Sequence, residues 1–143
     1  MNLRNFYNQI SRSLDFVNFE IKEETADKMV LQADLQARDH FDDDVLVKIV
    51  SFASGTLHVF FTFDHLDKNL RNYELINDFN TNTSWFSAYI KEGQRGNFFL
   101  EIHYATVDNV TEDIMAESVE FAFDQLLNED SFEYLRQLTQ VTY

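Results

Sequence analysis

The chain contains no cysteine, no proline and only three glycines among its 143 residues. Without cysteine it has no disulfide scaffold, no cysteine-ligated zinc site and no thiol nucleophile. The glycines stand at positions 55, 93 and 96, which is too sparse for a glycine-rich phosphate-binding loop. These absences exclude several common classes of enzyme and metal protein.

The sequence also lacks a long apolar run and has few basic residues. No apolar stretch approaches the ~18 residues needed to cross a bilayer, and residues 1–14 mix apolar and polar types, unlike a secretory signal. Eleven basic residues stand against 25 acidic ones, a formal charge of −14. This charge disfavours nucleic-acid phosphates and anionic membranes as partners. We therefore expect a cytoplasmic protein that binds neither nucleic acid nor membrane.

Apolar and aromatic residues are abundant. Fifteen phenylalanines, six tyrosines and one tryptophan provide material for a large core. A chain of this length buries roughly 68% of its unfolded surface and is typical of one domain, so we expect a single domain over residues 1–143.

Hydrophobic periodicity predicts the order of the elements. Apolar residues that recur about every 3.6 residues indicate helices near both ends of the chain and in its middle. Alternation of apolar and polar residues indicates strands between these helices. A turn is expected at Glu23 and Glu24, and Ser54-Gly55 is typical of a hairpin. The first half is expected to hold a helix over 3–14 capped by Asn2, followed by strands over 17–22, 29–35, 45–53 and 57–63. A second helix is expected from Asp67 to Asn80 or Asn82, and the residues on one of its faces are Leu70, Tyr73, Ile76 and Phe79 or Asn80. Strands over 85–91 and 97–104 follow, then a helix capped by Asn109 or Thr111, and a last short helix bearing Phe132, Leu135 and Leu138.

This order predicts an α+β fold. Consecutive alternating runs joined by short turns indicate an antiparallel sheet of five or six strands, and the helices are expected to cover one of its faces. The arrangement along the chain is α-β-β-β-β-α-β-β-α. The other sheet face should meet solvent and therefore be polar.

Aromatic residues occupy several positions on that second face. If Leu57 and Ile102 point toward the helices, alternation turns their neighbours away. The residues expected there are Phe60, Trp85, Tyr89 and Phe99, with His58 and His103 beside them. So many large rings favour an interface, for self-association or for a client protein. The alternative is that a flanking loop or the C-terminal tail covers them.

The last long helix has an apolar arc and an acidic arc. At about 100° per residue, Met115, Val119, Ala122 and Leu126 share the arc expected in the core. Phe121 lies at the edge of the acidic arc and is a candidate for a dimer contact. The acidic arc comprises Asp113, Glu117, Glu120 and Asp124. It is either a solvated helix face or a docking surface for a basic partner.

Two groups of residues could suggest a metal site or a catalytic site, but neither pattern supports one. His40 with Asp42, Asp43 and Asp44 could attract a hard cation, yet no glycine follows at the spacing of a calcium loop. His58, His65 and His103 have no serine or cysteine nucleophile in a recognisable context. We therefore predict no metal, no cofactor and no enzymatic activity.

Three short segments carry a resemblance to a known family. They are Leu75-Ile76-Asn77-Asp78-Phe79-Asn80, Trp85-Phe86-Ser87-Ala88-Tyr89-Ile90 and Asn109-Val110-Thr111-Glu112. In these the chain resembles the YbjN family, whose implied fold is shared with type III secretion chaperones. The resemblance implies an acidic, cytoplasmic, usually dimeric bacterial protein without catalytic residues, with helices packed on an antiparallel sheet. Such chaperones bind unfolded client segments along apolar patches.

Together these features predict a non-enzymatic protein-binding module. It would be a chaperone-like or regulatory homodimer that holds a basic or partly unfolded client segment on the aromatic sheet face, with Phe60, Trp85, Tyr89, Phe99 and Phe121 as contacts. The alternative is an acidic inhibitor that mimics DNA and acts on a basic partner.

Overall fold

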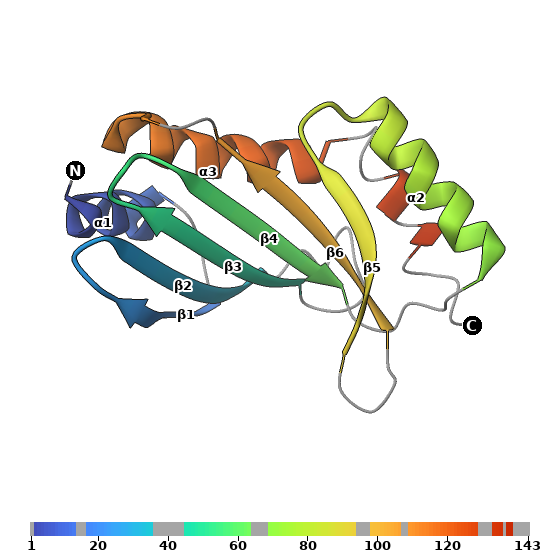
Figure 1. Ribbon diagram of the computed structural model, residues 1–143, viewed down its shortest axis with the longest axis horizontal. Coiled ribbons are helices and arrows are strands. Elements are labelled where there is room, and N and C mark those ends of the chain that lie inside the picture. The colour runs from blue at the N-terminus through green and yellow to red at the C-terminus, as the bar shows by residue number, and fades with distance from the viewer. Residues whose placement is uncertain are drawn as a thin grey trace.

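In the computed structural model, six antiparallel strands form one sheet that packs against helices (Figure 1). The structure describes residues 2–13, 17–35, 45–63, 69–93, 98–106, 109–128, 133–135 and 137–138. Residues 133–135 and 137–138 are helical. The labelled elements are α1 (Leu3–Ser13), β1 (Val17–Glu24), β2 (Lys28–Leu35), β3 (Val45–Phe52), β4 (Leu57–Phe63), α2 (Leu70–Asn82), β5 (Ser87–Glu92), β6 (Phe98–Ala105) and α3 (Glu112–Leu126).

The strand order is β1-β2-β3-β4-β6-β5. The first four strands form a meander, and the β5–β6 hairpin then adds to it through β6. In Figure 1, α1 and α3 lie behind the sheet, and α2 lies along the edge formed by β5. The predicted α+β fold and its element order are confirmed.

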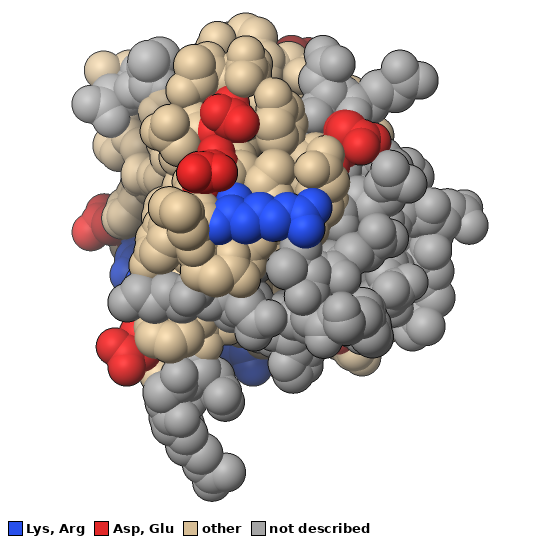
Figure 2. All heavy atoms as spheres, turned by 90° about the vertical axis from the view of Figure 1, so that its right-hand side faces the viewer, with Lys and Arg blue, Asp and Glu red and all other residues tan. Residues whose placement is uncertain are grey.

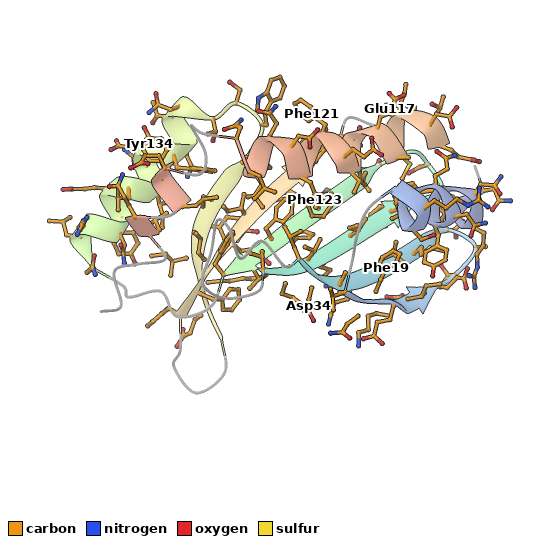
Figure 3. All side chains as sticks on the ribbon, turned by 180° about the vertical axis from the view of Figure 1, so that it is seen from behind. Phe19, Asp34, Glu117, Phe121, Phe123 and Tyr134 are labelled. Atoms are coloured by element: carbon orange, nitrogen blue, oxygen red, sulfur yellow. The ribbon has the colours of Figure 1, made fainter. Side chains whose placement is uncertain are left out.

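The core lies between the sheet and α3. Alternate residues of β4, such as Leu57 and Phe61, are fully buried toward the helices. Phe123 of α3 packs edge-on against Phe61, with ring centroids 5.2 Å apart. Figure 3 shows Phe123 pointing toward the strands and Phe121 pointing away from them. The four residues of the predicted apolar arc are all fully buried: Met115, Val119, Ala122 and Leu126.

Polar caps and one glycine set the ends of these elements. The Asn2 side chain accepts hydrogen bonds from the first turn of α1, and Thr111 accepts one from Ile114 N–H, as N-caps do. Gly55 has a φ of 96°, which side chains rarely adopt, and lies against the backbone of Val110 just before α3. The hairpin predicted at Ser54-Gly55 is confirmed, with residues 53–56 between its strands.

The α2 prediction was partly wrong. This helix begins at Leu70, where Asn69 is the N-cap, and not at Asp67, which lies outside the described residues. Its buried residues include Ile76 and Phe79, whereas Leu70 is 75% exposed and Tyr73 is exposed. Each step of three residues turns about 300° around the helix, so the three steps from Leu70 to Phe79 add up to about half a turn. Leu70 and Phe79 therefore point to opposite sides of α2.

Two boundaries near turns also differ. Glu23 and Glu24, predicted as a turn, are the last residues of β1, and the turn follows at residues 25–27. β5 starts at Ser87 and not at Trp85. Leu135 and Leu138 are buried as expected, while Phe132 lies outside the described residues.

The two outer strands are protected from pairing with other strands in different ways. β1 has two register shifts against β2 and a positive φ at Asn18, which distort its edge. At the opposite edge, the Asn80 carboxamide of α2 binds the backbone of Ala88 in β5. Asn80 Oδ1 accepts from Ala88 N–H at 2.7 Å, and Asn80 Nδ2 donates to Ala88 C=O at 2.9 Å. A helix side chain therefore takes the place of a strand neighbour.

Within the described ranges, none of the helices has the length and apolar character that crossing a bilayer requires.

Candidate functional site on the outer sheet face

The face of β3, β4, β6 and β5 that points away from α1 and α3 combines rings, imidazoles and few charges. We call it the outer face. Strand alternation and the cross-strand register assign its side chains. They are Leu46, Lys48, Val50, Phe52, His58, Phe60, Thr62, Ser87, Tyr89, Lys91, Phe99, Glu101, His103 and Ala105.

Two histidines and a phenylalanine form a stack at the centre of this face. Phe60 and His103 are cross-strand neighbours, and their rings lie 4.6 Å apart at an interplanar angle of 8°. His58 Nδ1 and His103 Nε2 are 2.8 Å apart, which is a hydrogen bond when one ring donates and the other accepts. Phe52 meets His58 edge-on at 6.2 Å. The stack joins three residues that are only partly exposed.

The hydrogen bond between the imidazoles requires at least one of them to be neutral. Burial lowers the pKa of His103 below its ordinary value of 6.5, and the charge of His58 lowers it further, while Glu101 acts in the opposite direction. Both rings can become charged only if the hydrogen bond between them is lost.

A nearly buried carboxylate lies next to this stack. Glu101 is only 9% exposed, and its cross-strand neighbours on the outer face are Thr62 and Tyr89. The Tyr89 phenol donates to Glu101, and burial together with this carboxylate raises the pKa of Tyr89 well above its ordinary value. Lys91 Nζ lies 3.4 Å from Glu101 Oε2, as an ion pair without an aligned hydrogen bond. Tyr89 and Lys91 thus hold the one carboxylate of the outer face.

The outer face differs in charge from the chain as a whole. Its charged residues are Lys48, Lys91 and Glu101, which amount to +1 with the histidines neutral. The whole chain carries −14. Lys48 and Leu46 are exposed, while Phe60, Phe99 and the imidazoles are partly exposed. This is a mixed polar and aromatic surface without the acidic excess found elsewhere.

The sequence grouped five interface residues, and the structure separates them. Phe60, Tyr89 and Phe99 lie on the outer face as predicted. The prediction was wrong for Trp85, because β5 begins two residues later and strand alternation does not extend to it. Trp85 instead packs edge-on against Phe121 of α3, with ring centroids 5.0 Å apart.

Trp85 and Phe121 form a second surface on the helix side of the sheet. Phe121 also lies 6.0 Å from the ring of Tyr104, a β6 residue on the face toward the helices. Trp85 is 53% exposed. The predicted acidic residues lie along the same helix, where Asp113, Glu117, Glu120 and Asp124 are all exposed. Figure 3 shows Glu117 and Phe121 on the side of α3 away from the strands.

Charge at the α2 end of the molecule is mixed. Figure 2 shows a basic side chain close to acidic ones on this end. The charged residues of α2 are Arg71, Glu74 and Asp78. α3, by contrast, carries no basic residue. Glu74 and Asp78 of α2 can therefore serve as control positions for charge changes on α3.

The contact between His58 and His103 was not predicted, although both were assigned to one side. β4 and β6 are separated in the sequence by α2 and β5, and nothing in either strand specifies their register. Alternation identifies the sheet face that a residue occupies. Identifying its neighbour on the next strand also requires the strand order and the register.

Metal ligands do not gather in the described part of the chain: no group of three or more His, Cys, Asp or Glu side chains there could hold an ion. His40, Asp42, Asp43, Asp44 and His65 lie outside the described residues.

Comparison with known proteins supports the fold. No family model matches the chain, and no curated protein matches it significantly. A crystal structure of YbjN from E. coli, a candidate transcription regulator, superposes with a TM-score of 0.54 at 13% sequence identity. The match covers 97% of this chain and 89% of the YbjN chain. The chain has the YbjN fold. The resemblance stated from the three short segments is thus confirmed at the level of the fold.

Proposed function

We propose that this protein is a non-enzymatic protein-binding module that acts as a homodimer, with the outer faces of two copies in contact. The observation that carries the proposal is the charge of the outer face, +1 in a chain of −14. Two copies of a strongly acidic protein repel each other across most surfaces. On the outer face each copy contributes a single, nearly buried carboxylate, Glu101.

The side chains of the outer face suit such a contact. Phe60 and Phe99 are partly exposed rings, and aromatic residues are enriched where protein interfaces bury area. The nearly buried Glu101 is already paired with Tyr89 and Lys91, so contact there would leave no isolated carboxylate. Burial of the remaining exposed ring area would drive the association at roughly 25 cal/mol per Å².

The same charges bear on the expected client. Lys48 and Lys91 flank the rings, so a basic segment is disfavoured on the outer face. A second copy of the chain is the occupant that we propose there. If the YbjN fold serves regulation in this protein as proposed for YbjN of E. coli, the acidic excess favours action through protein partners over contact with DNA phosphates.

The test is the molar mass of serine variants by light scattering. We expect the unmodified protein to have twice the 16.9 kDa mass of the chain, and the Phe60→Ser and Phe99→Ser double variant to be a monomer. Tyr73→Ser removes an exposed ring from α2 and serves as the matched control, with the dimer retained. Circular dichroism verifies that each variant is folded. A monomeric unmodified protein at about 100 µM, where dimers of ordinary affinity persist, would contradict the proposal.

A second candidate function remains the acidic inhibitor that mimics DNA. The observation in its favour is the exposed row of carboxylates on α3, a helix without a basic residue. Binding of this kind should weaken steeply as ionic strength rises, because the Debye length falls to about 10 Å at 0.1 M salt. Dimerisation through the outer face should change little over the same range.

A further inference from the structure

The outward surface of α3 carries exposed apolar side chains that the core does not use. Ile114 is 46% exposed and Trp85 is 53% exposed, while Phe121 lies edge-on beneath Trp85. In the described residues, these are two of only five large hydrophobic side chains that are exposed. The others, Leu70, Tyr73 and Leu46, lie on α2 and β3.

Helix geometry places Ile114 and Phe121 in one row. Seven residues bring the helix back to within about 20° of the same direction and advance it by about 10.5 Å. Ser118, whose hydroxyl donates to Ile114 C=O, lies between them near the same direction. Trp85 extends this row beyond Phe121. We call Ile114, Phe121 and Trp85 the α3 apolar row.

Carboxylates line one side of this row. Glu117 and Asp124 lie about 60° and 80° around the helix from Ile114, and Glu120 lies farther round the same side. Across the described ranges, none of the three forms a salt bridge or a hydrogen bond through its side chain. By contrast, Asp113 accepts a hydrogen bond from Gln9 of α1. The surface therefore has an apolar row beside three carboxylates that have no ion-pair partner within the described part of the chain.

We propose that the α3 apolar row binds a basic amphipathic helix of a partner protein. Apolar anchors spaced by about two turns match the i, i+3, i+4 and i+7 positions through which one helix lies against another. Lysine or arginine side chains on the flank of the partner helix would reach Glu117, Glu120 and Asp124. A second copy of α3 is disfavoured here because it would bring the same carboxylates together. The inference rests on the proposed protein-binding function but does not require the outer face.

Trp85 is the single tryptophan of the chain, so its fluorescence reports on this surface alone. The probe is a synthetic 18-residue helical peptide with leucines on one side and lysines on the other. The matched control peptide has glutamate in place of each lysine. We expect the lysine peptide to shift Trp85 emission to shorter wavelength, with an affinity that falls as salt rises, and the glutamate peptide to leave the emission unchanged.

Paired variants locate the binding. Glu117→Gln with Asp124→Asn should weaken the lysine peptide about fivefold, the effect of losing two exposed ion pairs. Glu74→Gln with Asp78→Asn makes the same chemical change on α2 and should leave the affinity unchanged. Ile114→Ser should weaken binding at least threefold, whereas Leu70→Ser, at an exposed leucine of α2, should not. These positions are exposed, so the variants are expected to fold.

Three results would overturn the inference. The first is binding of the lysine peptide without a change in Trp85 emission, and the second is an equal loss of affinity in the α2 and α3 charge variants. The third is equal binding of the two peptides. Repeating the titration with the Phe60→Ser and Phe99→Ser variant separates the two proposals. The monomer that the outer-face proposal predicts should bind the lysine peptide as tightly as the unmodified protein does. A folded monomer that no longer binds the peptide would contradict the α3 site and leave the outer-face dimer standing.

Discussion

The carboxamide of Asn80 makes the sharpest prediction about what holds the β5 edge in place. It donates to Ala88 C=O and accepts from Ala88 N–H, so Asn80→Ala removes two hydrogen bonds at once. Each contributes about 1 kcal/mol net, because the folded bond replaces one with water. Alanine also favours the helix over asparagine by about 0.5 kcal/mol. The net destabilisation expected is about 1.5 kcal/mol.

The control is Asn77→Ala on the same helix. Asn77 is exposed, so this variant gains only the helix propensity and should be slightly more stable. The difference between the two variants in the free energy of unfolding is then about 2 kcal/mol, measured by urea denaturation. A difference below about 0.5 kcal/mol would mean that water replaces Asn80 without loss, and that the carboxamide does not secure β5.

Two further predictions concern a glycine and the imidazole pair. Gly55→Ala should destabilise the protein by about 3 kcal/mol in urea denaturation, because the left-handed backbone disfavours a side chain and the new Cβ would stand 2.5 Å from Val110 O; an effect below about 1 kcal/mol would contradict this packing. For His103 the folded pKa is depressed, so the native state binds fewer protons than the unfolded chain between that pKa and 6.5. Its contribution to stability is therefore present above about pH 6.5 and is lost as the pH falls through the lowered pKa. Unfolding measured at pH 7.5 and 5.5 should show a smaller loss for His103→Gln than for the unmodified protein, and an equal loss would refute the assignment.

Periodicity predicted most of the fold because it reports burial directly. Alternation in β4 assigned Leu57 and Phe61 to the core and Phe60 to the outer face, since successive strand residues face opposite ways. The 3.6-residue period of α3 likewise separated Met115 from Glu117. In both elements one buried face determines the pattern.

Failures occurred where the pattern alone was ambiguous. Trp85 was assigned to the outer face because the apolar run beginning there resembles a strand, but the strand begins at Ser87. In α2, the row through Leu70 and Phe79 turns around the helix, so its first residue is exposed and its last buried.

Cross-strand contacts could not be predicted from the sequence, for a different reason. His58 and His103 are 45 residues apart, and their hydrogen bond depends on β6 pairing with β4 inside the sheet. The two surfaces of the candidate site therefore required the structure.

The most direct test of the dimer is the molar mass of a charge-reversal variant, Lys48→Glu with Lys91→Glu. It changes the outer face from +1 to −3 without altering any core residue. Arg71→Glu on α2 is the control for a reversed charge elsewhere. Light scattering at physiological salt should find the outer-face variant at 16.9 kDa and the control at twice that mass. If both variants have the same mass, the outer face is not the contact between copies.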